Sequence, residues 1–379
     1  MPAAGDAGPE TDARLMARAV DLARSVRRHT APNPWVGAVV AHGDEIVGEG
    51  ATSPPGGPHA EIHALRAAGA RARGATLYTT LEPCSHHGRT PPCVDAVRDA
   101  GVARVVVALE DPDPNVAGRG IAVLRDAGIT VDVGAGAHDA RASLAAYLHH
   151  RRTGRAYALL KTATSVDGRV AAADGTSRWI TGPDARRDAH ELRADSQAVL
   201  VGAGTALADE PSLTVRDVDD PPRVAPVRVV VDARGRVPAT GPLFDTALAP
   251  TLVVTTDAAP TRAVDAWRAA GAKVELVEPS SAGAGVDLAG TLAVLGGLGV
   301  LQVLVEGGPT VHASFLEAGL ADAVVAYVAP VVIGDRGRPA FALPGAATIG
   351  DASQWQLTSV TRVGNDARLD LTPTPGAMD

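Results

Sequence analysis

Aromatic residues and cysteines are scarce in this 379-residue chain. Aromatic side chains make up 3% of it, and the only cysteines are Cys84 and Cys93. Small secreted domains that depend on disulfides are dense in cysteine, so that class is excluded. Hydrophobic residues still make up 46% of the chain, which indicates a packed globular protein whose core is filled by small and branched side chains.

Long apolar runs and a positive charge balance are also missing. Apolar stretches such as Val300 to Val305 have the length of a strand, whereas a spanning helix needs about 20 apolar residues. A formal charge of −8 argues against a nucleic-acid or membrane surface binder, although arginine clusters can still hold a small anionic substrate. No N-terminal segment resembles a secretion signal, so we expect a cytoplasmic protein, in which two cysteines are better read as metal ligands than as a disulfide.

The length of the chain predicts more than one domain. The first half alternates helical and strand patterns, with a helix over 12–28, a hairpin of strands from 36–41 and 46 onward, and further elements at 59–68, 75–80, 93–100, 102–109, 121–127 and 129–133. We find no internal repeat, so the halves are different α/β domains. The expected division is a disordered tail (1–10), a first domain (11–135), a linker helix (136–154), a second domain (155–372) and a short tail (373–379).

The second domain shows strand patterns separated mostly by helices. The expected strands are 156–163, 198–202, 227–232, 251–255, 273–277, 300–306 and 323–329. Two segments rich in proline or glycine, 217–226 and 278–290, are expected to be surface loops.

A histidine and the two cysteines have the composition of a catalytic zinc site. His59 opens a helix, Cys84 follows a strand, and Cys93 comes after eight more residues. Catalytic zinc has three protein ligands and one open position, and a deaminase also needs a carboxylate that moves protons without binding the metal. Glu61, two residues after His59, suits that role. The alternative is a closed structural site, for which His63, His86 or His87 would supply a fourth ligand.

Three stretches of the first domain, TAPNPWVGAVV, GGPHAEIHAL and TLYTTLEPCSHHGRTPPC, resemble the bacterial bifunctional riboflavin biosynthesis enzymes, the pyrimidine deaminase/reductase family. The resemblance implies a cytidine-deaminase-like fold, with His59, Cys84 and Cys93 as zinc ligands and Glu61 as proton shuttle. It also implies that Asn33 contacts the substrate. The family commonly has a histidine, associated with substrate contact, seven residues before the zinc histidine, where this chain has Thr52.

The clearest local pattern of the second domain is a strand that runs into Gly307-Gly308 and then into a helix. Backbone amides at such a helix start can bind a dinucleotide phosphate, although a glycine pair at this kind of turn is often only a tight turn. Together with KTATSVDGR, SRWITG, HELR and VGAGTALADEPSLTVR, this pattern resembles the reductase domain of the same family, whose fold is similar to dihydrofolate reductase.

The resemblance implies a set of contacts in this domain. Those to NADPH are Ala163, Trp179, Thr205, Asp209, Gly308, Pro309, Thr310, Val311, His312, Ala313 and Ser314. Those to the substrate are Ser177, Arg193, Leu213, Arg216 and Glu306. Arg193 and Arg216 are the expected clamps for a ribose phosphate, since arginine forms forked hydrogen bonds to phosphate. Lys161 and Asp167 are further candidates.

The expected reaction is hydrolytic deamination of 2,5-diamino-6-(5-phosphoribosylamino)pyrimidin-4-one by zinc hydroxide. NADPH then reduces the ribosyl group to a ribityl phosphate. One alternative is a zinc deaminase of another nucleobase with a ligand-binding, non-reducing C-terminal domain, and another is a non-catalytic binding protein stabilised by zinc. The expected partner is the small phosphoribosyl pyrimidine, with no nucleic acid or membrane, and the resemblance suits a homodimer or higher homo-oligomer.

Overall fold

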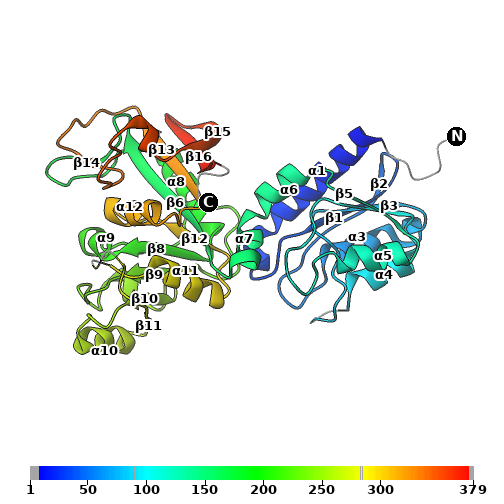
Figure 1. The fold of residues 1–379 in the computed structure, drawn as a ribbon, viewed down its shortest axis with the longest axis horizontal. Coiled ribbons are helices and arrows are strands. Elements are labelled where there is room, and N and C mark those ends of the chain that lie inside the picture. Colours follow the sequence, from blue (N-terminus) through cyan, green and yellow to red (C-terminus); the bar gives the residue numbers. More distant parts are fainter. Residues whose placement is uncertain (1–7, 89–90, 282, 284, 375–379) are drawn as a thin grey trace. The chain divides into compact units, whose positions relative to one another are not determined.

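The computed structural model describes residues 8–88, 91–281, 283 and 285–374. The chain divides into two compact units, Met1–Gly154 and Arg155–Asp379 (Figure 1). Most of the two expected tails, residues 1–7 and 375–379, lies outside the described residues. The first helix already begins at Pro9, because proline is well tolerated in a first helical turn, so a tail reaching residue 10 was too long. Among the described residues, no helix is long and apolar enough to cross a membrane.

The first unit is a five-stranded sheet in the order β2-β1-β3-β4-β5, where β1 is antiparallel to β2 and β3 and the remaining pairs are parallel. The strands are β1 Gly37–His42, β2 Glu45–Ala51, β3 Thr76–Thr79, β4 Arg104–Val107 and β5 Thr130–Val133. The helices are α1 Pro9–Ser25, α2 Arg27–Thr30, α3 Ala60–Ala68, α4 Cys93–Ala100, α5 Arg119–Asp126, α6 Ala137–Ser143 and α7 Ala145–Thr153.

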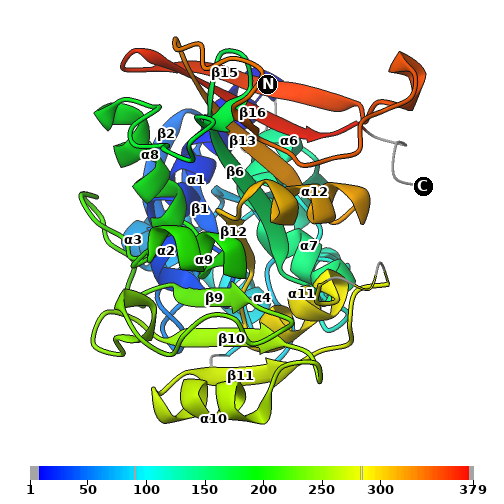
Figure 2. The same cartoon turned by 90° about the vertical axis from the view of Figure 1, so that its left-hand side faces the viewer.

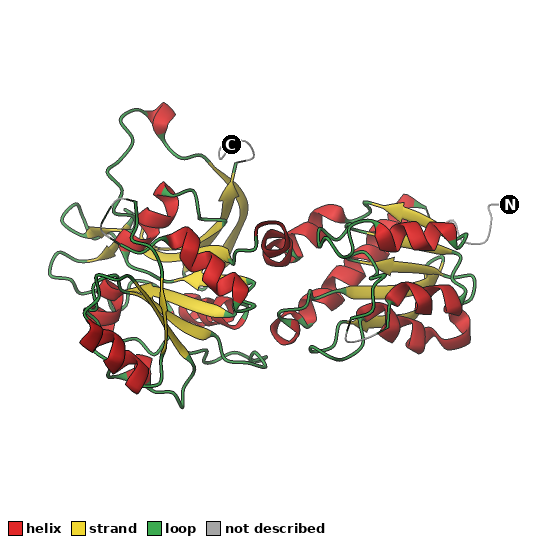
Figure 3. Cartoon of the chain, turned by 60° about the horizontal axis from the view of Figure 1, so that its bottom comes forward, coloured by secondary structure: helices red, strands yellow, loops and turns green. Residues whose placement is uncertain are grey.

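Helices cover both faces of this sheet, with α1 and α6 on one side and α3, α4 and α5 on the other (Figures 1 and 3). Helix α1 buries Leu15, Ala19 and Ala23 at the spacing of one helical face. It approaches β1 closely at Gly37, where a Cβ would lie 1.9 Å from the Ala19 carbonyl oxygen. Glycine at this position lets the strand that follows the Asn33 loop lie directly beneath the helix.

The second unit contains a nine-stranded sheet in the order β11-β10-β9-β8-β12-β6-β13-β16-β15. Its first seven strands are parallel, and β16 and β15 join antiparallel at one edge (Figure 2). The strands are β6 Tyr157–Ser165, β8 Ala198–Gly202, β9 Val227–Val231, β10 Thr251–Thr255, β11 Lys273–Leu276, β12 Gln302–Val305, β13 Ala323–Ala329, β15 Trp355–Val363 and β16 Asp366–Pro373, and β7 Arg169–Ala171 pairs with β14 Arg338–Pro339.

Alternate residues of these strands enter separate cores. Leu200 packs into a cluster with α11 and α12, whereas Val199 packs into a cluster with α9 and α10, because successive side chains point to opposite faces. Helix α8 covers the latter face nearer β13. The helices are α8 Pro183–Ala194, α9 Ala203–Asp209, α10 Thr261–Ala269, α11 Leu288–Gly297 and α12 Pro309–Glu317. Both units are α/β, as the sequence predicts.

The predicted elements 93–100, 198–202, 251–255 and 323–329 are confirmed to the residue. The loop predicted over 278–290 is wrong at its end, since Val286 is buried and Asp287 caps α11 from Leu288. The helices predicted over 12–28 and 136–154 are each divided in two, near Val26 and Leu144. The β15–β16 hairpin was not predicted, because its outer strand is exposed along most of its length and carries little hydrophobic periodicity.

Candidate active sites

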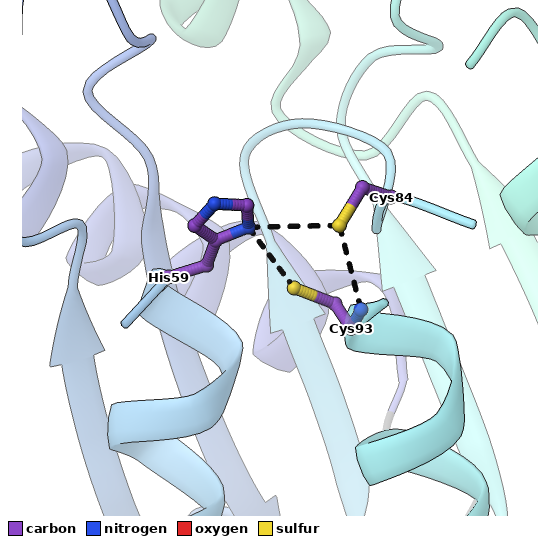
Figure 4. A group of neighbouring side chains, drawn as sticks. All are labelled: His59, Cys84 and Cys93. Atoms are coloured by element: carbon purple, nitrogen blue, oxygen red, sulfur yellow. Dashed lines mark hydrogen bonds between the residues drawn. The ribbon is translucent and has the colours of Figure 1, made fainter. Parts of the chain in front are cut away.

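Three secondary-structure ends bring His59, Cys84 and Cys93 together in the first unit (Figure 4). His59 directly precedes α3, Cys84 lies in the loop after β3, and Cys93 is the first residue of α4. His59 Nδ1 lies 3.2 Å from Cys93 Sγ and 3.6 Å from Cys84 Sγ, and the backbone N–H of Cys93 donates to Cys84 Sγ at 3.4 Å. All three ligand atoms lie within 4.8 Å of one another.

The donor set fits zinc, which favours thiolate and imidazole ligands. The hydrogen bond with Cys93 holds the pKa of the Cys84 thiol well below its ordinary value, so a thiolate is available to a cation. The group comprises three residues within the described part of the chain. Of the candidates for a fourth ligand, His63 shares a 2.8 Å hydrogen bond with Ser53 Oγ, and His86 and His87 are exposed. The arrangement favours a site with an open position over a closed one.

Glu61 lies on the first turn of α3 and is 4% exposed. Burial raises the pKa of its carboxyl to about 7, although the positive charge of His59 opposes this. A group with a pKa near neutrality both accepts and releases protons readily, which suits a general acid–base.

The predicted substrate loop precedes β1. Asn33 is partly buried there, and its backbone N–H donates to the Thr30 carbonyl. Thr52, the residue that departs from the family pattern, is 4% exposed, and its hydroxyl exchanges hydrogen bonds with the backbone N–H and carbonyl of Val36. Thr52 therefore fastens the end of the Asn33 loop to β2.

The second unit has a cleft with a volume of about 1150 Å³. The cleft lies at the carboxyl ends of β6, β8, β9 and β12, where open parallel sheets generally bind ligands. The amino end of α12 enters it: a Cβ at Gly307 would lie 2.7 Å from Val311 Cβ, and one at Gly308 would lie 3.1 Å from Thr205 Oγ1. Bare backbone at a helix start fits a nucleotide phosphate.

Most of the predicted reductase residues line this cleft. They are Lys161, Ala163, Ser177, Thr205, Asp209, Glu306, Gly308, Pro309, Thr310, Val311, His312 and Ser314. Ala313 is buried on the inner side of α12, and Leu213 is buried in the core against β8 and α9. Trp179 is 69% exposed beneath the Arg186 guanidinium, and Asp167 accepts hydrogen bonds from the backbone N–H groups of Ile333 and Gly334, which anchors that loop.

Glu306, at the end of β12, holds a buried ion pair at the inner wall of the cleft. Its carboxylate accepts two hydrogen bonds from Arg193, at 2.5 and 3.0 Å, and lies 3.7 Å from Lys161 Nζ. Arg193 also donates to the Thr214 carbonyl at 2.9 Å. Its guanidinium therefore makes three hydrogen bonds within the protein, and its contact with a substrate phosphate stays a prediction. Arg216 is exposed and donates to Ser212 Oγ at 3.0 Å, so it remains accessible.

Part of the cleft wall had no signal in the sequence. The cleft continues along the turn after β9, with Ala233, Arg234 and Arg236, and past Ser280 and Ser281 in the loop before α11. Buried Asp232 shapes the turn by accepting hydrogen bonds from the backbone N–H groups of Arg236 and Val237, at 2.6 and 2.7 Å. These segments lie far apart in sequence from Gly308, and only the sheet order brings them to one cleft.

Fold and sites together define a zinc-dependent deaminase joined to an NADPH-dependent reductase. Residues 9–109 match the cytidine and deoxycytidylate deaminase zinc-binding region, and residues 156–369 match the RibD C-terminal domain. The chain belongs to the RibD family of bifunctional riboflavin biosynthesis enzymes.

Relatives of similar length support this assignment. The chain is 42% identical to the riboflavin biosynthesis protein RibD of Bacillus amyloliquefaciens, over 95% of this chain and 96% of that protein, and 42% identical to RibD of Escherichia coli K12, over 95% and 99%. A solved structure of Acinetobacter baumannii RibD superposes with a TM-score of 0.86 at 38% identity, covering 97% of this chain and all of that one.

A Thermotoga maritima structure described as a diaminohydroxyphosphoribosylaminopyrimidine deaminase/5-amino-6-(5-phosphoribosylamino)uracil reductase has a TM-score of 0.83 at 31% identity. It covers 97% of this chain and 99% of its own.

Proposed function

We propose that this chain deaminates 2,5-diamino-6-(5-phosphoribosylamino)pyrimidin-4-one and then reduces the ribosyl group of the product to a ribityl group. The observation that carries the proposal is the buried Glu61 beside the open donor set of His59, Cys84 and Cys93. The name of the similar Thermotoga maritima protein includes both activities and supports the choice of substrate.

In the deaminase unit, His59, Cys84 and Cys93 would hold zinc. Bound zinc supplies a Lewis acid that makes water nucleophilic near neutral pH. Glu61 would take one proton from the attacking water and pass it to the pyrimidine ring nitrogen. It would then take the second proton from the same oxygen and pass it to the departing amino group, which leaves as ammonia while the carbonyl forms. Asn33 contacts the pyrimidine from the loop that Thr52 fastens.

In the reductase unit, the residues that line the cleft would hold NADPH, which would supply the hydride that reduces C1′ of the substrate ribose. The backbone amides around Gly308 bind the cofactor pyrophosphate, and Thr205 borders the same place. Arg216 binds the substrate phosphate with an accessible guanidinium. Arg193 holds Glu306 and so keeps a fixed negative charge, with Lys161 beside it, at the inner wall where the ribose reacts. Arg234 and Arg236 add two guanidinium groups to the cleft lining after β9.

We also propose that the protein is cytoplasmic, since both thiol ligands must remain reduced, and that it forms a homodimer or higher homo-oligomer. Size measurement by light scattering tests the assembly, and a monomer at micromolar concentration would contradict it.

The experiment that tests the function is incubation of the zinc-loaded full chain with the diamino pyrimidinone ribotide, with and without NADPH, followed by mass analysis. Without NADPH, we expect one ring amino group to be replaced by oxygen with release of ammonia. With NADPH, we expect a further gain of two hydrogens. Ammonia release from cytosine or guanine but not from the ribotide would contradict the substrate, and a deaminated product left unreduced by NADPH would contradict the second step.

A further inference from the structure

The loop that carries Cys84 is held by the carboxylate of Glu82, a residue to which neither the motif nor the mechanism gives a role. Glu82 is 4% exposed. Its Oε1 accepts hydrogen bonds from the backbone N–H groups of Gly120 and Ile121, at 2.8 and 3.1 Å. Its Oε2 accepts from Gly118 and Asp111, at 2.9 and 3.2 Å. One carboxylate therefore satisfies four backbone donors.

Three of these four donors, those of Gly118, Gly120 and Ile121, belong to the N-cap and first turn of α5. The first N–H groups of a helix have no partner within the helix, and a negative charge placed there is favourable. Glu82 thus caps α5 from a distant part of the sequence. Its own backbone N–H donates to the Leu109 carbonyl at 2.9 Å, so both ends of this residue are fixed to the segment that follows β4.

The packing continues directly to the metal ligand. A Cβ at Gly120 would lie 2.0 Å from the Pro83 carbonyl oxygen, so the backbone between Glu82 and Cys84 lies tightly against the start of α5. On its other side, the Cys84 carbonyl accepts from the backbone N–H of Val94 at 3.3 Å. The segment from Glu82 to Cys84 is therefore clamped between the first turns of α4 and α5.

We propose that Glu82 is a positioning residue for the metal site, which fixes Cys84 at the distance from His59 and Cys93 that a cation requires. The proposal rests on the zinc site proposed above. In a chain without this anchor, the Cys84 loop must be ordered when the metal binds, and the entropic cost lowers affinity. Residues that orient metal ligands from outside the first coordination shell typically change metal affinity by about 10- to 100-fold.

The test is the zinc affinity of the full-length Glu82→Gln variant, measured by competition with a chromophoric chelator. The amide keeps the size of the side chain but directs an NH2 group at backbone donors that need an acceptor. We expect the zinc dissociation constant to rise roughly 10- to 100-fold. The matched control is Glu110→Gln, which removes the same charge from an exposed side chain in the segment after β4. It should leave the zinc dissociation constant unchanged.

A second variant covers the case in which Glu82→Gln lowers the yield of folded protein. Glu82→Asp keeps the charge but is too short to reach every donor, so its zinc affinity should fall between those of the wild type and Glu82→Gln. The absorption of the cobalt-substituted protein, which depends on thiolate ligation, should change in the same order. A lower melting temperature with zinc affinity within twofold of wild type in both variants would reduce Glu82 to a helix cap and overturn the proposal.

The outcome is separable from the proposed function. If the ribotide were not the substrate, the zinc affinities would still rank as wild type, Glu82→Asp, Glu82→Gln. If the ranking failed while the wild type deaminated the ribotide, only the role of Glu82 would fall.

Discussion

Replacement of Glu306 by glutamine should destabilise the reductase unit by an amount that depends on pH. Glu306 is buried at the end of β12, where its carboxylate pairs with Arg193 at 2.5 Å and lies 3.7 Å from Lys161. The side chains of Arg193 and Glu306 are only 15% and 10% exposed. Glutamine has almost the same size, so the substitution removes the negative charge and leaves Arg193 buried without its counter-charge.

The magnitude follows from the pKa of Glu306. Burial by itself would raise it, but the charges of Arg193 and Lys161 outweigh burial and lower it from 4.5 to about 2. Each pKa unit corresponds to about 1.4 kcal/mol, so the ionised carboxylate stabilises the folded state by about 3 kcal/mol at neutral pH. Removal of one partner from a buried ion pair generally costs about 3–5 kcal/mol, which agrees.

The sign of the pH dependence is determined by the direction of the shift. Because folding lowers this pKa, the stabilisation is complete above about pH 4.5 and is lost as the pH falls towards 2. The free-energy difference between wild type and Glu306→Gln should therefore be constant from pH 7 to 5 and shrink at lower pH. Hydrogen exchange of peptides from β6 and β12 at increasing urea measures this difference for the second unit alone.

The matched control is Glu317→Gln, which removes an exposed carboxylate from the neighbouring helix α12 and should change stability by less than about 0.5 kcal/mol. Equal stability of Glu306→Gln and wild type at pH 7 would refute the reasoning. So would a difference of about 3 kcal/mol that stays constant down to pH 3, since the loss would then come from packing and not from charge.

Three further outcomes are expected. Glu61→Gln should keep its zinc, measured by metal analysis, but lose about 10²- to 10⁴-fold in ammonia release, because a buried proton carrier is removed; near-normal release would contradict its role. Removal of zinc by a chelator should abolish deamination, while NADPH oxidation with separately deaminated substrate continues. The reason is that the cleft of the second unit contains none of the three predicted zinc ligands. A parallel loss of both activities would contradict this. Asp12→Asn should destabilise the first unit by about 3 kcal/mol in a denaturant melt. Asp12 is 8% exposed, pairs with Arg104 at 2.7 Å and accepts a hydrogen bond from the Tyr78 hydroxyl at 2.8 Å. An unchanged unfolding midpoint would exclude a role for the ion pair.

Local chemistry explains why so much of the fold was predictable. The strand over Ala198–Gly202 and the helix over Cys93–Ala100 carry their periodicity and their glycine boundaries within a few residues. The β15–β16 hairpin was missed because its pairing with β13 is a long-range interaction and its outer strand is exposed. Similarly, Asp287 ends its loop by capping α11, a contact that a glycine-rich composition obscures.

The sequence by itself predicted the reaction chemistry, because His59, Glu61, Cys84 and Cys93 have the residue types that a zinc deaminase site needs. It also determined that a helix starts after Gly308, since that information is local. Only the tertiary structure decided which partners the buried polar side chains have. Arg193 is bound to Glu306, and Thr52 fastens the Asn33 loop. Glu82 caps a helix 36 to 39 residues away. Each of these contacts joins segments distant in sequence. Their partners are selected by the order of strands in the sheets and by the need to pair every buried polar group, which no local pattern encodes.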